Sequence, residues 1–415
     1  MTTLSVVIPA YNEEGGIADI AHRVLAIRPE LQSSGVGDLE VLVVDDGSAD
    51  ATARIAGSLG GVRLVRHPHN RGYGAALKTG FSKARGELVG FLDADGTYPP
   101  ESFPRLCQAA LNGADLVIGS RMAGEASKMP VTRRIGNWLF AALLTALTHQ
   151  RISDSASGMR VFKREILESL YPLPDGLNLT PVMSVRAAHE GIRMTEVPIP
   201  YDERLGRSKL SVIRDGSTFL QSILWTALSY NPARIIGAVG ALGFLTALLV
   251  GIGLLAARLA GITSLGTWGV AAVYFGMVSG VVGISLFALG ATFNYLVGLF
   301  HKRPVRRGLF GRPVFDPPLE LSFGWIGALM VLLGLVIGAV SLVLGAQGWE
   351  LVRLWLYLLG SAMLVLVGTQ LILSWIVIQV LEELSRRPDM ASDDLQAAGA
   401  PATAPTNLGA TEGAV

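Results

Sequence analysis

Two acidic residues separated by one position are the clearest candidates for chemistry in this sequence. Asp93 and Asp95 stand in the segment ELVGFLDADGTYPPE, where an apolar run typical of a buried strand ends. Residues two apart on an extended chain point to the same side, so both carboxylates can reach one Mg²⁺ or Mn²⁺. Such a cation can also bind a diphosphate and neutralise its charge. An Asp-x-Asp pair alone is weak evidence for a metal site, because surface turns carry it often.

The acids need a scaffold, and the first half of the chain alternates strand-like runs with helical patterns. The strand-like runs are residues 4–9, 39–45, 62–66, 88–93 and 115–119. Helix-type apolar spacing covers residues 17–27, 51–59, 75–84 and 103–111. This alternation predicts an α/β fold with a mostly parallel, doubly wound sheet. Ligands of such sheets bind beyond the carboxyl ends of the strands, where Asp45, Asp46, Asp93 and Asp95 fall.

The second half of the chain is strongly apolar. The mean hydropathy of +0.46 is too high for an ordinary soluble globular protein. Stretches of about 20 apolar residues span a bilayer, and four such stretches predict transmembrane helices at residues 235–259, 267–300, 321–345 and 351–380. The second connection between them carries Lys302, Arg303, Arg306, Arg307 and Arg312, whereas the other two are short and lack Lys and Arg. The positive-inside rule therefore predicts an integral membrane protein with both ends in the cytoplasm.

These patterns predict four parts along the chain. They are a cytoplasmic domain over residues 1–205, amphipathic juxtamembrane helices over 206–233, a four-helix membrane region over 234–384 and a disordered cytoplasmic tail over 385–415. Residues 133–149 and 211–230 have apolar faces that fit two alternatives, helices on the membrane surface or helices of the domain core. The first ten residues lack Lys and Arg and favour a first strand over a signal peptide.

Composition argues against several other classes. A net charge of +1 gives no basic field of the kind that holds nucleic acid, so nucleic acid is not an expected partner. Cys107 is the only cysteine, which excludes an intrachain disulfide and a thiolate metal cluster and fits a reducing cytoplasm. His67 and His69 flank Pro68 and favour a solvated turn over metal ligation. Asp154 either orients Arg160 or a sugar, or caps the turn that follows it.

Further motifs occur in register with the acid pair. They are SVVIPAYNEEGGI at 5–17, VLVVDDGSAD at 41–50, HPHNRGYGAALKTGF at 67–81 and GSRMAG at 119–124. Together with Asp93 and Asp95 they resemble the catalytic domain of glycosyltransferase family 2. SGMRVFKRE at 157–165 and EVPIPYDERLGRSKL at 196–210 resemble its dolichol-phosphate mannose synthase branch, including relatives that use bacterial polyprenyl phosphates.

The resemblance implies a GT-A type nucleotide-diphospho-sugar transferase domain that binds a GDP- or UDP-sugar. It assigns contacts with the nucleoside, the ribose or sugar and other parts of the donor to Pro9, Tyr11, Glu13, Asp45, Asp46, Arg71 and Gly72. It makes Asp93 and Asp95 ligands of Mg²⁺ or Mn²⁺. Many relatives carry Gln two residues after the second acid, where this chain has Thr97. The third metal ligand would then be the Thr97 hydroxyl or a bound water.

The resemblance also supplies basic residues for the phosphates of donor and acceptor. The matching positions are Arg121, Arg133 or Arg134, Arg204, Ser208 and Lys209, and Asn137 stands where some relatives have a small hydroxyl residue. The candidate catalytic residues are Asp95, Arg121, Arg204 and Lys209. Arginine suits this task because its forked donors match phosphate oxygens. For the basic residues just before the first span, attraction to anionic membrane lipids is the alternative role.

The function expected from these features is inverting transfer of a hexose, with mannose or glucose favoured, to a polyprenyl phosphate of the dolichyl or undecaprenyl type. No general base stands out, and a phosphate monoester with a second pKa near ~6 needs none. Two alternatives are a transferase acting on another lipid such as diacylglycerol, and a transporter or flippase with a non-catalytic nucleotide-sugar-binding domain. The Gln-x-x-Arg-Trp motif of processive polysaccharide synthases does not occur. The sequence leaves homo-oligomerisation open.

Overall fold

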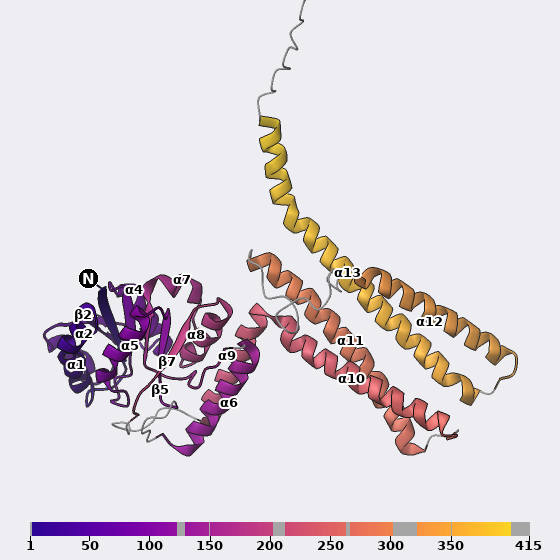
Figure 1. The fold of residues 1–415 in the computed structure, drawn as a ribbon, viewed down its shortest axis with the longest axis horizontal. Helices are drawn as coiled ribbons and strands as arrows, with labels where there is room; N and C mark the ends of the chain where they lie inside the picture. The colour runs from indigo at the N-terminus through magenta and orange to yellow at the C-terminus, as the bar shows by residue number, and fades with distance from the viewer. Residues whose placement is uncertain are drawn as a thin grey trace, which may run out of the picture. The chain divides into compact units, whose positions relative to one another are not determined.

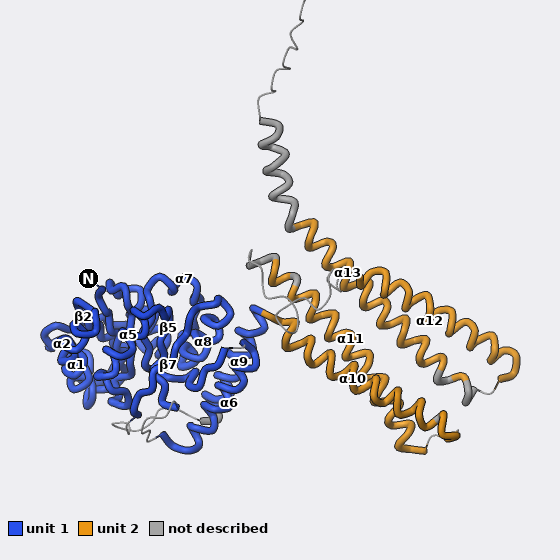
Figure 2. The backbone as a smooth tube through the Cα atoms, viewed as in Figure 1, with its two compact units in different colours: residues 1–230 blue, residues 231–415 orange. Residues whose placement is uncertain are grey.

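The computed structural model describes residues 2–122, 129–148, 150–201, 212–262, 266–301, 322–349 and 351–399 (Figure 1). The chain divides into two compact units, Met1–Tyr230 and Asn231–Val415 (Figure 2). The first unit therefore extends beyond residue 205, where the sequence places the end of the catalytic domain, and includes the helix that precedes the first apolar stretch.

A single sheet organises the first unit. Its described strands are β1 (Thr2–Ala10), β2 (Val36–Asp45), β3 (Val62–Arg66), β4 (Leu88–Phe91), β5 (Leu116–Ser120), β6 (Arg160–Lys163) and β7 (Met194–Pro198), in the order β3-β2-β1-β4-β6-β5-β7. Neighbouring strands among β1 to β4 are parallel, as are β5 and β7, and β6 is antiparallel to both of its neighbours. The predicted mostly parallel sheet is confirmed.

Helices cover both faces of this sheet. On one face, α1 (Ile17–Ala26), α3 (Thr52–Ser58) and α5 (Phe103–Leu111) bury apolar residues against Val6 and Ile8. Because strand side chains alternate between faces, Val7 points the other way, and there α4 (Tyr73–Lys83) packs so closely that Gly80 leaves no room for a Cβ. Phe81 of α4 lies 5.6 Å from Phe91 and 5.2 Å from Phe162 between ring centroids. The sheet is thus doubly wound, as predicted.

Two longer helices of the first unit have both buried and exposed apolar residues. They are α6 (Val131–Thr148) and α9 (Val212–Tyr230), which pack against each other and against α8 (Leu179–His189). Leu144 and Ile223 are fully buried, whereas Trp138 and Trp225 are exposed by 61% and 66%. One side of each helix therefore belongs to the domain core, as the first alternative predicts, and the apolar residues of the other side are exposed; the placement on a membrane surface stays a prediction. The remaining short elements are α2 (Arg28–Ser33), η1 (Pro100–Ser102), η2 (Arg164–Ile166) and α7 (Leu167–Leu170).

The second unit contains the predicted apolar helices. They are α10 (Pro232–Leu259), α11 (Thr267–His301), α12 (Phe323–Ala346) and α13 (Leu351–Gly399), and within the described residues each has a segment long and apolar enough to cross a membrane. Helices α10 and α11 can approach each other closely because glycines lie where they meet. A Cβ on Gly240 would lie 2.6 Å from the Gly283 carbonyl oxygen. α13 continues to Gly399, so residues 385–399 are helical where the composition predicts a disordered tail. Arg, Met, Ala, Leu and Gln in this segment favour a helix.

Candidate active site

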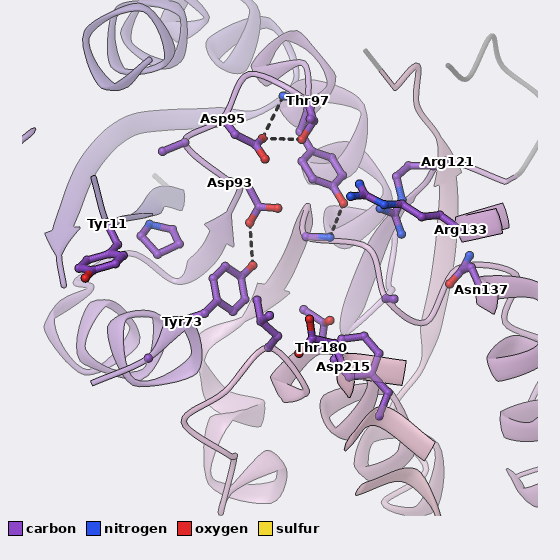
Figure 3. Close-up of a pocket in the computed structure, with 18 of the residues that line it drawn as sticks. Tyr11, Tyr73, Asp93, Asp95, Thr97, Arg121, Arg133, Asn137, Thr180 and Asp215 are labelled. Atoms are coloured by element: carbon purple, nitrogen blue, oxygen red, sulfur yellow. Dashed lines mark hydrogen bonds between the residues drawn. The ribbon is translucent and has the colours of Figure 1, made fainter. Parts of the chain in front are cut away.

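The acid pair lies at a cavity of about 470 Å³ in the first unit. β4 ends at Phe91, so Asp93 and Asp95 stand in the turn beyond the strand and both line the cavity (Figure 3). The phenol of Tyr73 donates a hydrogen bond of 2.8 Å to Asp93 Oδ1. The Thr97 hydroxyl donates one of 2.6 Å to Asp95 Oδ1. Each acid is thus held by a neighbouring hydroxyl group.

This arrangement fits a divalent cation that shares its ligands with a bound phosphate. Mg²⁺ typically binds to one or two carboxylates, waters and substrate phosphates, which is what Asp93 and Asp95 could provide with a diphosphate. Among the described residues, no group of three His, Cys, Asp or Glu side chains could hold a metal. Thr97, the predicted third ligand, uses its hydroxyl to hold Asp95.

The predicted nucleoside end of the cavity is formed by the loop after β1. Pro9, Tyr11 and Glu13 line it, and in the view of Figure 3 Tyr11 lies at the opposite end from Asn137, with Asp93 between them. Backbone N–H groups tie this loop to the turn after β2 and to α3: that of Asn12 donates to the Ser48 hydroxyl at 2.9 Å, and that of Glu13 donates to the Thr52 hydroxyl at 2.8 Å. The structure thus brings these three predicted residues beside the acid pair.

Asp45, the last residue of β2, and Asp46, which follows it, have different surroundings. Asp45 is fully buried, and its Oδ2 lies 3.3 Å from Arg66 Nε. Asp46 lines the cavity and accepts hydrogen bonds from the backbone N–H groups of Arg71 and Gly72 at 2.9 and 2.8 Å. Its Oδ1 is also 2.7 Å from Nδ1 of His67. Asp46 therefore fixes the turn at Gly72 that leads into α4, which we call the glycine turn.

The predicted solvated turn is wrong for His67, whereas His69 is exposed in a bend, as predicted. The ring of His67 is buried, with Nε2 2.9 Å from the Thr79 hydroxyl and Nδ1 on Asp46. The sequence gives no sign of this because Thr79 lies on α4 and Asp46 after β2, and only the fold brings both to the histidine. His67 supports the glycine turn indirectly through Asp46.

The glycine turn packs closely against the backbone of residues 174–176. The Ala75 N–H at the start of α4 donates to the Asp175 carbonyl at 3.1 Å, and a Cβ on Gly72 would lie 2.5 Å from that carbonyl oxygen. Lys78 Nζ lies 2.6 Å from Asp175 Oδ1. Farther along, Asn178 Nδ2 donates to the Ser222 hydroxyl of α9 at 2.7 Å. Residues 171–178, which we call the strap, therefore bond to both α4 and α9.

Arg121 is held rigidly at the cavity wall. Its Nε and Nη2 donate to the two oxygens of Asp154 at 2.8 and 2.7 Å, and its backbone N–H donates to the same carboxylate. The guanidinium carbon lies 5.7 Å from the ring centroid of Tyr98 and 5.3 Å from that of Tyr201. Burial works to raise the pKa of Asp154, but the charge and hydrogen bonds of Arg121 outweigh it and keep that pKa below its ordinary value. Asp154 thus orients Arg121, a partner that the sequence did not indicate.

Helices α6 and α9 form the other end of the cavity. Arg133 and Asn137, one helical turn apart on α6, line it, whereas Arg134 is exposed. The structure thus separates the two arginines that the sequence left as alternatives. Asp215 and Phe219 of α9 also line this end, and neither was a candidate from the sequence. The predicted residues Arg204, Ser208 and Lys209 lie outside the described residues.

A doubly wound sheet with an Asp-x-Asp pair after β4, beside a cavity shared by the loop after β1, defines the GT-A class of glycosyltransferase. Residues 5–171 match the model of glycosyl transferase family 2. Residues 232–392 match a domain of unknown function (DUF8752). The chain belongs to glycosyl transferase family 2, and the predicted family and enzyme class are confirmed.

Three curated relatives are about one third identical to this chain over the aligned residues. A low-salt glycan biosynthesis hexosyltransferase of Haloferax volcanii is 34% identical, and the match covers 59% of each protein. A dolichyl-phosphate hexose transferase of the same organism is 33% identical over 54% of this chain and 94% of its own length. An undecaprenyl-phosphate 4-deoxy-4-formamido-L-arabinose transferase of Photorhabdus laumondii is 31% identical over 60% of this chain and 75% of its own length.

One solved structure is similar to part of this chain. Glucosyl-3-phosphoglycerate synthase from Mycobacterium tuberculosis, crystallised with Mn²⁺, UDP and phosphoglyceric acid, superposes with a TM-score of 0.44 and 23% identity. The match covers 55% of this chain and 78% of that chain.

Proposed function

We propose that this protein transfers a hexose from a nucleotide-diphosphate sugar to a polyprenyl phosphate, with inversion at the anomeric carbon. The observation that carries the proposal is a single cavity with two chemically different ends. One end has Tyr11, Glu13 and the acid pair, which suit a nucleoside diphosphate. The other has Arg133 beside the apolar rings of Phe140 and Phe219, which suit a phosphate on an apolar chain. Two of the relatives are named for transfer to dolichyl phosphate or undecaprenyl phosphate.

Charge neutralisation is the main task of such a site. Two unit charges about 4 Å apart repel each other by about 4 kcal/mol at an effective dielectric constant of about 20. A diphosphate and a phosphate monoester can therefore approach only between cations. Arg133 supplies positive charge, Arg121, held by Asp154, supplies an oriented guanidinium, and Asp93 and Asp95 would hold the Mg²⁺ or Mn²⁺ that neutralises the leaving diphosphate. The acceptor oxygen is already ionised near neutral pH, so the protein's role is positioning.

The acceptor end also has the features of a membrane-proximal site. α9 ends at Tyr230, and the first apolar helix begins at Pro232. The exposed rings of Trp138 and Trp225 suit the boundary between lipid and water. We propose that the catalytic unit is cytoplasmic, because the connection between α11 and α12 carries a cluster of Lys and Arg.

Sugar transfer in membranes tests the proposal. Membranes that contain the full chain are given radiolabelled GDP- and UDP-sugars with polyprenyl phosphate, with EDTA and after Mg²⁺ or Mn²⁺ is restored. We expect labelled polyprenyl lipid from one donor, abolished by EDTA and restored by metal, with the anomeric configuration inverted. Label in a diacylglycerol lipid would show that the acceptor is diacylglycerol rather than polyprenyl phosphate. Retention of the anomeric configuration would refute a single displacement.

Matched variants separate catalysis from folding. Asp93→Asn should abolish labelled lipid because it removes one acid of the pair. Asp19→Asn, at an exposed acid on α1, is the control and should retain activity. Wild-type turnover in Asp93→Asn would refute the site. Nucleotide-sugar binding without transfer to any lipid would favour the non-catalytic transporter alternative.

A further inference from the structure

The carboxylate of Asp93 is restricted by two neighbouring groups. Tyr73 donates its hydroxyl to Oδ1 at 2.8 Å from one side (Figure 3). On the other side the chain passes at Gly158, where a Cβ would lie 2.6 Å from Oδ2. The Gly158 N–H in turn donates to the Tyr98 hydroxyl at 2.7 Å. The carboxylate is therefore confined between a phenol and a backbone segment that is itself fixed.

Tyr73 is in turn fixed by its position at the start of α4. The preceding residue, Gly72, has a φ of +105° and donates its N–H to Asp46 at 2.8 Å. Two residues after Tyr73, the Ala75 N–H donates to the Asp175 carbonyl of the strap. These backbone bonds fix the start of α4, from which the Tyr73 hydroxyl reaches Asp93.

We propose that Tyr73 is a positioning residue for Asp93, whose hydrogen bond sets the affinity of the acid pair for a divalent cation. This inference deepens the proposed function and rests on it. Groups that orient a metal ligand commonly change metal affinity about 10- to 100-fold when removed. Among the described residues no third His, Cys, Asp or Glu joins the pair, so a misplaced Asp93 has no substitute.

The alternative role is direct contact between the phenol and the donor, because Tyr73 also lines the cavity. The two roles predict different kinetics. A positioning residue changes the Mn²⁺ concentration needed for half-saturation, and a high Mn²⁺ concentration restores the rate. A donor-binding residue changes the KM for the sugar nucleotide and leaves the Mn²⁺ midpoint unchanged.

Tyr73→Phe in the full-length, detergent-solubilised protein tests the proposal. Mn²⁺ binding is followed by the electron paramagnetic resonance signal of free Mn²⁺, in parallel series with UDP and with GDP, and the Mn²⁺ dependence of transfer is measured alongside. We expect the Mn²⁺ midpoint to rise by about 10-fold or more in both assays. Transfer should recover at saturating Mn²⁺. Tyr357→Phe, at an exposed tyrosine of α13 that does not line the cavity, should leave both midpoints unchanged.

A second variant changes the backbone segment that contacts the Asp93 carboxylate at Gly158. Gly158→Ala keeps the phenol but pushes the carboxylate, so it should also raise the Mn²⁺ midpoint. A shift in Gly158→Ala without one in Tyr73→Phe would overturn the proposal, as would unchanged or tighter Mn²⁺ binding in Tyr73→Phe. The resonance assay needs no sugar transfer. A shifted midpoint without any labelled lipid would therefore refute the proposed acceptor while supporting the role of Tyr73.

Discussion

The buried pair of Arg121 and Asp154 gives a prediction whose size follows from the structure. Asp154 is fully buried and accepts three hydrogen bonds from Arg121, so Asp154→Asn leaves a guanidinium charge without its counter-ion. Removing one partner of a buried ion pair costs about 3–5 kcal/mol. Because the contacts of Arg121 with Tyr98 and Tyr201 remain, we expect a loss near the lower end, about 3 kcal/mol.

Thermal unfolding of the full chain measures this loss. For a unit of this size, about 3 kcal/mol corresponds to a decrease in Tm of about 6–12 °C. Transfer, assayed well below the new Tm, should also fall by about 10-fold or more, because Arg121 is no longer aimed at the cavity. A Tm within about 2 °C of wild type would refute the reasoning, since it would mean that the pair is solvated rather than buried.

A double variant separates the structural role of the pair from its function. Arg121→Met with Asp154→Leu replaces both charges by apolar groups, which is often neutral or stabilising in a protein interior. We expect the double variant to recover most of the lost Tm while transfer stays abolished. Recovery of transfer together with Tm would show that the guanidinium does no more than hold the fold.

Three further predictions concern other groups around the site. Thr97→Val should weaken Mn²⁺ binding because Asp95 loses a hydroxyl donor, whereas Thr97→Ser should not; equal Mn²⁺ midpoints in the two variants would contradict this role. His67→Phe should lower the free energy of unfolding by about 1–3 kcal/mol, since Asp46 loses a buried partner, and an unchanged denaturation midpoint would contradict it. Hydrogen bonds from Arg193, against a smaller effect of burial, hold the pKa of Asp115 below its ordinary 3.8, so its contribution is present above that pH and lost as the pH falls further. Tm measured from pH 7 to pH 3 should therefore fall below about pH 4, less steeply in Asp115→Asn, and identical curves would refute the assignment.

Strands β1 to β5 were predictable because each is a short run of apolar residues followed by a polar turn, whereas β7, which pairs in parallel with β5, was not among the predicted strands. β1, β2 and β4 are almost wholly buried, so their composition alone marks them. The acids after β2 and β4 then follow from the rule that ligands bind at the carboxyl ends of parallel strands. Composition also predicted where the globular part of the chain gives way to the apolar helices, because a membrane helix needs a long apolar run.

The antiparallel strand β6 was not predictable from its own four residues. It begins with Arg160, which is fully buried although arginine is usually exposed. Its guanidinium donates to the carbonyls of Ser155 and Ser157, and burial lowers its pKa to about 10. These partners are backbone groups in a tight turn, and no side-chain pattern reveals them.

Contacts between residues distant in the chain explain the other omissions. Asp154 and Arg121 are 33 positions apart, and either reading of Asp154 from sequence was compatible with its neighbours. Asp215 reaches the cavity only because α9 packs on α6. Helical periodicity shows that a helix has an apolar side, but not which partner covers that side.

The strap has a consequence for engineering acceptor choice by exchanging segments between family members. It is bonded to α4 through Lys78 and Asp175, and to α9 through Asn178 and Ser222. A chimera that receives only α9 from another family member would lose the bond between Asn178 and Ser222. This loss would disturb the strap, which also contacts α4. If the proposed function holds, a change of acceptor preference requires both segments, and the smallest transferable unit should carry residues 171–178 together with α9.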